Sequence, residues 1–336
     1  MELCDILQAI LAFNYHYGPE NKDLLESIRA EVPTAPARRL RQHRDVLRAN
    51  VDNVVLMFGC RKDPKKFARH FKENSRSDLG IMLLPKFEID KMFANYTDKW
   101  IEWESYPPHV LVYLDFSAKS HRPKQFDWVL PEASLYEDMC IAYNQALDAA
   151  GVAPILTVPA REAKIRDFCL RGAVLSAFYF VEAYLNGVAF DYAIRSGKKL
   201  SEQDAEALLE WNTKLGKEKW VSFREKLHKY PRIILGLQHS PITETNSSEM
   251  NLLITKAKDV RDAIVHQSPK MDLASGEASP KVKEFLHLRL VDVTQTVDAA
   301  VSLVRTLNGL LGKNGIKIDW LLARDSTGRF PKEAFL

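Results

Sequence analysis

The stretch K-D-V-R-D-A-I-V-H-Q-S-P, Lys258–Pro269, closes a helical pattern that we expect to begin near Ser247, with Asn246 as a possible N-cap. Spacings of four, three and four residues separate its apolar side chains, Leu253, Ala257, Val260 and Ile264. This spacing predicts one face that packs inward. The neighbouring polar residues are expected to lie off that face: Lys256, Lys258, Arg261 and Asp262.

The chain around this stretch reads as one antiparallel helical bundle over Pro159–Gly312. A long helix is predicted over Arg161–Ile194, with Ala173, Ala177, Phe180, Tyr184 and Val188 spaced for one face. Ser201 is a good N-cap for a second helix to about Leu215, and a third is expected over about Glu218–Leu227. The last helix is expected to open at Ser279-Pro280 and to continue to Leu311.

Residues 1–158 have a different pattern of apolar residues and prolines, which predicts an N-terminal α+β domain. Short β-prone runs bounded by prolines indicate a small mixed sheet: Leu79–Leu84, Val110–Phe116, Phe126–Leu130 and Ile155–Val158. An amphipathic helix over Ala133–Ala150 interrupts these strands. The fold class is therefore mainly α, with a bundle at residues 159–312 and a C-terminal tail at 313–336.

A basic segment covers residues 35–76, where twelve Lys and Arg stand against four Asp and Glu, a net charge of +8. Such a block is a plausible footprint for a nucleic-acid backbone, with Arg38, Arg39, Arg41 and Arg44 as candidate RNA-binding residues. The alternative is that these charges do not bind a ligand and form the solvated faces of ordinary helices.

The Arg-x4-His pair of the opening stretch, Arg261 and His266, has the chemistry for cutting RNA without a metal. A neutral imidazole takes the proton of a ribose 2′-hydroxyl, and a guanidinium stabilises charge on the adjacent phosphate. Five positions at ~100° per residue put the two side chains ~140° apart on a regular helix. Either the helix loosens at His266, because Pro269 disfavours helix at Ser268, or a twofold partner completes the site. We expect both.

The motif R-D-A-I-V-H on a late helix, after a long helix with F-V-E-A-Y-L-N-G at Phe180–Gly187, resembles the HEPN (higher eukaryotes and prokaryotes nucleotide-binding) domain over about residues 160–312. The family signature is Arg, four to six residues, then His, often with a polar residue after the Arg, here Asp262. The resemblance implies a homodimeric, metal-independent endoribonuclease with Arg261 and His266 as catalytic residues. It also implies a role as a toxin or in defence against phage, with an antitoxin or defence-system partner protein.

Asp262, directly after Arg261, is expected to support the catalytic pair, and three further residues are candidate supporting groups. Glu182 and Asn186 share a face of the long helix and are expected to orient His266 or a phosphate; the alternative is an internal polar pair that satisfies itself. Lys258 lies three residues before Arg261 and extends the grip on phosphate, unless it is simply an exposed lysine.

The sequence has no motif for phosphate-loop nucleotide binding, dinucleotide binding, serine hydrolysis or zinc proteolysis: it contains no G-x-x-x-x-G-K-[ST], G-x-G-x-x-G, G-x-S-x-G or H-E-x-x-H. The four cysteines are far apart and have no ligand spacing, so we expect reduced thiols, no metal and no cofactor. No run approaches the ~18 apolar residues of a membrane helix, and no export signal is visible. The expected location is the cytoplasm, without membrane contact.

The leading hypothesis is an RNA-cleaving bundle fused to a domain for substrate selection, regulation or partner contact. The alternative is a non-catalytic dimerisation, nucleotide-binding or scaffold protein. In that case His266 would interact with the dipole at the helix end.

Overall fold

A computed structural model describes residues 30, 38–39, 42, 75–76, 81–87, 107–115, 125–150, 160–266 and 288–331. The chain divides into two compact units, Met1–Leu130 and Pro131–Leu336. The described residues are mainly α-helical, as predicted. The strand predicted at Ile155–Val158 lies outside the described residues.

The first unit contains a four-stranded sheet in the order β1-β2-β3-β4. Its strands are β1 (Ser75–Arg76), β2 (Ile81–Pro85), β3 (Leu111–Asp115) and β4 (Gln125–Val129). All three described pairings are antiparallel, so the mixed sheet predicted from the sequence is wrong for this part of the chain. The link from β3 to β4 is shorter than the dozen or more residues that a parallel crossover needs.

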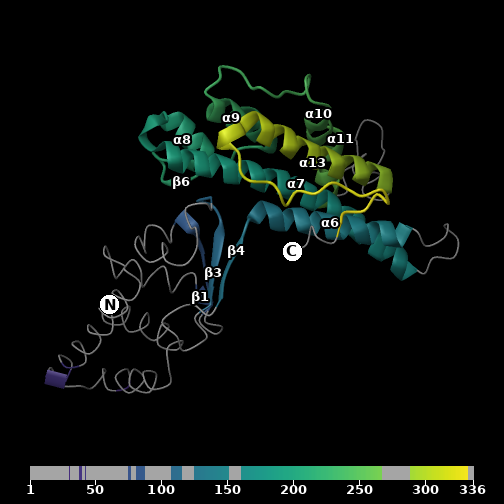
Figure 1. The fold of residues 1–336 in the computed structure, drawn as a ribbon, viewed down its shortest axis with the longest axis horizontal. Coiled ribbons are helices and arrows are strands. Elements are labelled where there is room, and N and C mark those ends of the chain that lie inside the picture. The colour runs from purple at the N-terminus through teal and green to yellow at the C-terminus, as the bar shows by residue number, and fades with distance from the viewer. Residues whose placement is uncertain are drawn as a thin grey trace, which may run out of the picture. The chain divides into compact units, whose positions relative to one another are not determined.

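The second unit is helical, and Figure 1 shows its long helices side by side. They are α6 (Pro131–Ala150), α7 (Ala160–Ser196) and α13 (Leu290–Leu311), joined by α8 (Glu202–Leu208), α9 (Phe223–Leu235), α10 (Ser248–Ile254) and α11 (Lys256–Val265). Because α6 packs along α7, it belongs to this unit. The sequence-based boundary at residue 158 falls inside the α6–α7 hairpin.

Helix α7 is the centre of the unit, with α6, α9, α11 and α13 all packed against it. Its predicted inward face is confirmed by complete or nearly complete burial of five side chains: Ala173, Ala177, Phe180, Tyr184 and Val188. The helix ends where predicted, since Gly197 has a φ of +52°. By length and composition the segment Ala163–Ser196 of α7 could cross a membrane, but 61% of its 18-residue apolar window is buried, as in the core helix of a bundle.

The chain after α13 packs against the helices, although the sequence reads as a tail from residue 313. Ile316, Leu321 and Phe330 are buried in the core of the helical unit. Asn144 exchanges two hydrogen bonds with the backbone of Phe330, at 2.9 and 3.1 Å, and Tyr136 donates one to Leu322 O at 2.8 Å. We call residues 315–331 the C-terminal strap.

The predictions for residues 201–237 need correction. Ser201 caps α8 as expected, but α8 ends at Leu208, and a hairpin of β5 (Trp211–Asn212) and β6 (Lys217–Glu218) replaces the predicted end at Leu215. The tight turn is possible because Gly216 has a φ of +59°. The next helix is predicted at Glu218–Leu227. It is α9, which begins at Phe223, and its N-terminus is closed by a capping box of Ser222 and Glu225.

The motif helix and the last helix also differ from expectation. Ser247, and not Asn246, is the N-cap, and its hydroxyl accepts from Met250 N at 3.1 Å. Thr255, with φ −114° and ψ −101°, breaks the single predicted helix into α10 and α11. Arg289 is extended just before α13, so the predicted helix from Ser279 is not continuous; residues 267–287 lie outside the described residues.

We predict that Phe330→Ala lowers the free energy of unfolding by about 3–4 kcal/mol, because a buried ring is lost from the contact with Tyr136 and Tyr143. Urea unfolding followed by far-UV circular dichroism measures it. Leu310→Ala, at a side chain 41% exposed, is the control and should cost less than about 1 kcal/mol. Equal stability of Phe330→Ala and the parent would show that the strap adds nothing.

Candidate functional site

Helix α11 ends at Val265, as the position of Pro269 predicts. His266 is the C-cap residue, with φ −115° and ψ 67°, and its backbone N–H donates to Asp262 O at 2.9 Å. Its side chain is exposed. The chain leaves the helix after His266, but the His266 N–H still closes the helical ladder, so the ~140° between Arg261 and His266 is largely kept and the two side chains are not brought together within one chain.

Asp262 brings two of the predicted basic residues together. Its Oδ1 accepts hydrogen bonds from Arg261 Nε and Nη2 at 3.0 and 2.6 Å, and its Oδ2 accepts one from Lys258 Nζ at 2.6 Å. The expectation that Asp262 lies off the packed face is wrong, since it is only 9% exposed. Two cations on one carboxylate leave a net charge of +1 at this end of α11.

Arg261 is held from a second direction by α7. Its guanidinium carbon lies 5.4 Å from the ring centroid of Phe178, a cation–π contact. The guanidinium is thus fixed between a carboxylate and an aromatic face. Among the polar contacts of the described residues, none joins Arg261 to His266, so a ligand or a partner has to bridge them.

The pKa of Asp262 lies below its usual value through two opposed effects. Burial raises this pKa, but hydrogen bonds from Lys258 and Arg261, together with their positive charges, outweigh burial and lower it. Asp262 is therefore a carboxylate at neutral pH, which is the state that orients Arg261.

Glu182 and Asn186 contact a residue that the sequence did not single out. Lys226 of α9 is 3% exposed, and its Nζ donates to Glu182 Oε1 at 2.7 Å and to Asn186 Oδ1 at 3.1 Å. The alternative of an internal polar pair is closer to this geometry, with a buried ammonium as the missing third member. The prediction that they orient His266 or a phosphate stays a prediction.

The same ammonium binds Glu210, at 2.6 Å from its Oε1. Tyr230 donates to this oxygen at 2.9 Å, and burial followed by the charge of Glu210 raises the pKa of Tyr230, which keeps it a proton donor. Glu210 has a φ of +49°, a left-handed conformation that is uncommon for a residue with a side chain. The Lys226 cluster, Lys226 with Glu182, Asn186, Glu210 and Tyr230, therefore joins α7, α9 and the hairpin.

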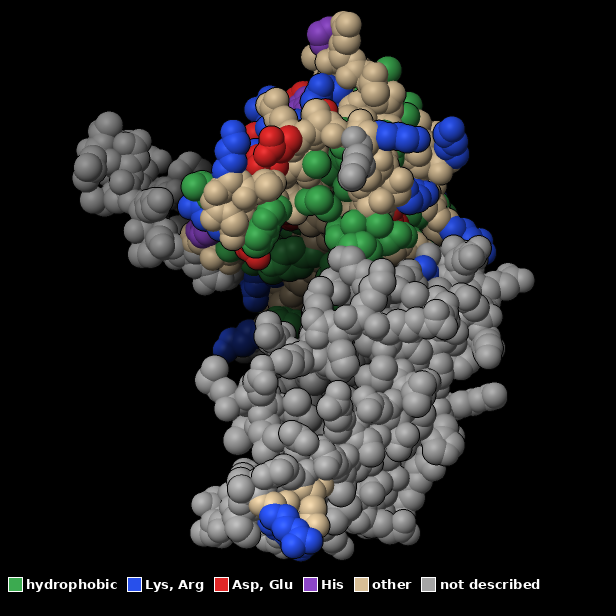
Figure 2. Space-filling model, turned by 90° about the vertical axis from the view of Figure 1, so that its left-hand side faces the viewer, with side chains coloured by type: hydrophobic (Ala, Val, Ile, Leu, Met, Phe, Trp, Pro, Cys, Tyr) green, Lys and Arg blue, Asp and Glu red, His purple; other side chains and the backbone are tan. Residues whose placement is uncertain are grey.

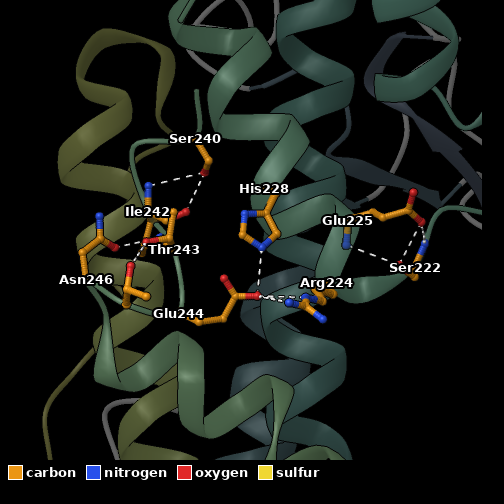
Figure 3. A network of polar contacts seen from close by, with 10 residues as sticks. Ser222, Arg224, Glu225, His228, Ser240, Ile242, Thr243, Glu244 and Asn246 are labelled. Atoms are coloured by element: carbon orange, nitrogen blue, oxygen red, sulfur yellow. Dashed lines mark hydrogen bonds and ion pairs between the residues drawn. The ribbon is translucent and has the colours of Figure 1, made fainter. Parts of the chain in front are cut away.

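A separate polar network fastens the segment before α10 to α9 (Figure 3). Glu244 Oε1 accepts from Arg224 Nε at 2.8 Å and lies 3.2 Å from His228 Nε2. Asn246 Oδ1 accepts from Thr243 N at 2.7 Å, which explains why Asn246 is not the helix cap. Each of these groups already has a hydrogen-bond partner within the network, so the network serves to hold this segment against α9.

The predicted RNA-binding arginines of the basic segment are described only in part. Arg38 and Arg39 are exposed, and both lie in helical backbone; Arg39 Nη1 donates to Gln42 Oε1 at 3.5 Å. Arg41 and Arg44 lie outside the described residues. Among the residues that the structure describes, no group of three or more His, Cys, Asp or Glu is placed to hold a metal ion.

Sequence reasoning missed Phe178 and Lys226, although each carried a signal. Phe178 lies four residues before Glu182, so the two share a face of α7 on which Asn186 also lies. Lys226 sits among the apolar positions of α9, where a lone lysine needs a buried partner.

No known protein family, curated protein or solved structure matches this chain.

We predict that Asp262→Asn lowers the free energy of unfolding at pH 7 by about 1.5–3 kcal/mol, the range for hydrogen bonds to charged groups. The folded pKa of Asp262 lies below its ordinary 3.8, so this stabilisation is complete above pH 3.8 and is lost as pH falls through the lower folded value. Urea unfolding from pH 7 to pH 2 measures it. Asp259→Asn, exposed on the same helix, should change less; a gap from wild type that persists undiminished at pH 2 would contradict the assignment.

We also predict that Lys226→Met lowers the free energy of unfolding by about 3 kcal/mol, because it leaves two carboxylates facing each other without their cation. Lys229→Met is the matched control, since Lys229 pairs with Glu225 in an exposed bridge worth about 0.3–0.5 kcal/mol. Chemical unfolding of both variants in parallel measures the difference. Equal losses would show that the buried cluster has no special weight.

Proposed function

We propose that the chain is a metal-independent endoribonuclease of HEPN type, with Arg261 and His266 as its catalytic residues. The observation that carries the proposal is the end of α11. An exposed imidazole stands at the C-cap of the helix at His266, five residues after a guanidinium held by Asp262 and Phe178. An oriented cation beside a proton acceptor is what transesterification of RNA requires.

In the proposed reaction, neutral His266 takes the proton from a ribose 2′-hydroxyl. The 2′-oxygen attacks the adjacent phosphorus, and the bond from phosphorus to the 5′-oxygen breaks. Arg261 stabilises the charge on the non-bridging oxygens. A protonated imidazole gives its proton to the departing 5′-oxygen, which leaves a 2′,3′-cyclic phosphate and a 5′-hydroxyl.

The acid and the base are different groups in this scheme, so a second imidazole is needed. We propose a homodimer that brings two α11 ends to one cleft, because a twofold axis supplies one His266 as base and the other as acid. In this scheme Asp262 is a positioning residue that acts through Arg261. The roles as a toxin or an anti-phage effector, and a cytoplasmic location, belong to the same proposal.

A second candidate function is a non-cleaving dimerisation, nucleotide-binding or scaffold protein. The contacts of Arg261 favour it, since a guanidinium already paired with Asp262 and laid on Phe178 also describes a structural residue. Exposed apolar side chains on α7, including Phe168 at 70% and Tyr179 at 47%, are suited to a protein interface.

The test is incubation of the full chain with unstructured RNA in EDTA. We expect cleavage with cyclic phosphate ends, and a loss of about 10²–10⁴-fold in rate for His266→Ala, as for removal of a general acid–base group. Arg261→Lys should lose most of its rate, because an ammonium cannot make the bidentate contact.

The controls separate catalysis from folding. His239→Ala removes an exposed histidine from another loop and should keep full activity. All variants should keep the circular dichroism spectrum of the parent. Full activity of the His266→Ala protein would overturn the proposed mechanism, and binding of nucleotides or protein without any cleavage would favour the scaffold.

A further inference from the structure

The outward face of α7 carries an uncharged stripe that stays partly exposed in the described part of the chain. It lies between α6, whose Ala142 is close to Gly172, and the α9 and α11 residues that contact Phe178. On this face Phe168 is 70% exposed and Tyr179 47%. We define the α7 stripe by six residues that lie within ~40° of Tyr179 at ~100° per residue: Phe168, Gly172, Leu175, Tyr179, Ala183 and Phe190.

The stripe has no charged member, although it runs along most of a long helix. Between residues 165 and 190 the charged side chain nearest to it is Glu182, ~60° from Tyr179, and Glu182 is bound to Lys226. The end of the helical unit with α8 and β6 is different, because hydrophobic side chains lie there among Lys and Arg (Figure 2). A helix that is apolar on its outward as well as its inward face is usually covered by another surface.

The spacing of the stripe fits a second copy of the same helix. In an antiparallel pair with a twofold axis at Tyr179, residues at equal distances before and after Tyr179 lie opposite each other. Leu175 then faces Ala183 of the partner subunit, and Gly172 faces Asn186 of the partner subunit. In both pairs a larger side chain meets a smaller one, so the two helices can interdigitate.

Aromatic rings lie at both ends of this arrangement. Phe168 and Phe190 are eleven residues before and after Tyr179, so each faces the other across the interface. The helices that border the stripe add exposed apolar groups, Ile141 of α6 and Val265 of α11. A stripe roughly 33 Å long and ~10 Å wide covers less than the ~800 Å² per partner of a standard interface, so we expect a dimer that dissociates on dilution.

The same axis brings the two proposed sites to one side of the pair. Phe178, which holds Arg261 at 5.4 Å, directly precedes Tyr179 and so lies next to the axis in each copy. A twofold axis perpendicular to the plane of two antiparallel helices keeps equivalent flanks on the same side. Both α11 helices therefore flank the α7 pair on one side. Arg261 and His266 are not brought together within one chain, so the second imidazole has to come from another copy.

A bilayer fits this face less well than a protein does. Glu182 borders the stripe with a side chain 33% exposed, and Arg261 borders it on α11. Insertion into a bilayer would carry these charges toward hydrocarbon at a large cost. At the rim of a protein interface they stay in contact with water.

We propose that the α7 stripe is the interface between two copies of this chain, with Tyr179 on the twofold axis. The proposal rests on the proposed function for the pairing of the two α11 ends, and on the spacing and exposure of the stripe for the surface itself. Each copy then supplies Arg261 and His266 to a site that neither copy completes alone.

The test is sedimentation velocity of the full chain over a range of protein concentrations, without RNA. We expect a monomer–dimer equilibrium, and Tyr179→Glu should weaken it by about 30-fold or more, because two carboxylates would meet at the axis. Val291→Glu places the same charge at an apolar side chain 50% exposed on α13 and should leave the equilibrium unchanged. Both variants should keep the circular dichroism spectrum of the parent. A parent that is monomeric at every concentration, or a Tyr179→Glu protein that dimerises like the parent, overturns the proposal.

Cysteine cross-linking tests the position of the axis without an added charge. Tyr179→Cys should form a disulfide-linked dimer under mild oxidation, because residues that face each other on the axis fall within the ~4.4–6.8 Å between Cα atoms that a disulfide needs. Phe168→Cys alone should not, since its two copies lie roughly 33 Å apart. The parent, with its own four cysteines, gives the background. Linking through residue 168 and not through residue 179 overturns the proposed axis.

The remaining outcomes separate this proposal from a membrane surface and from the catalytic proposal. Flotation of a monomeric parent with phosphatidylcholine vesicles, lost in Tyr179→Glu, overturns the interface in favour of a lipid surface. If the chain dimerises through Tyr179 and cleaves no RNA, the catalytic proposal fails and the interface stands. If RNA is cleaved while Tyr179→Glu dimerises like the parent, the interface alone fails.

Discussion

The burial of α7 is the constraint on which the helical unit depends. This helix has 37 residues, and its inward face carries alanines, an aromatic pair and a valine. These apolar side chains are buried only if other helices cover α7 along its length. Small side chains such as Ala173 and Ala177 let neighbours approach closely, and at Gly172 an added Cβ would be in ordinary contact with Ala142 of α6, at 3.5 Å. The positions of α6, α9, α11 and α13 follow from this requirement.

One face of α7 is different, because it carries polar and aromatic groups that contact α9 and α11. Phe178 supports Arg261, and it also packs on Phe223 of α9 at 5.3 Å between ring centroids. Glu182 and Asn186 hold the buried ammonium of Lys226. Arg261 and the Lys226 cluster are thus both held by side chains of α7.

Periodicity predicted the long helices well, because α6, α7 and α13 bury continuous apolar faces that repeat along the sequence. It failed where a single residue decides the backbone. The left-handed Glu210, the break at Thr255 and the extended Arg289 each interrupt a pattern that reads as helix. At the site, the motif predicted Arg261 and His266 as a pair, and the proline predicted the helix end. Phe178 is far from Arg261 in the sequence, and Lys226 is far from Glu182, so no local spacing predicts these two contacts.

The break at Thr255 separates the stability of α11 from that of α10. A helix of ten residues has no appreciable stability in isolation, and its hydrogen-bond ladder does not continue smoothly into α10. Its folding is maintained by the buried contacts of Ala257, Val260 and Ile264, and its first turn is tied to α13 by the Lys256–Asp292 bridge at 2.7 Å. The segment that carries Arg261 and His266 is therefore a small cooperative unit. We therefore expect amide hydrogens of α11 to exchange faster than those along the buried face of α7.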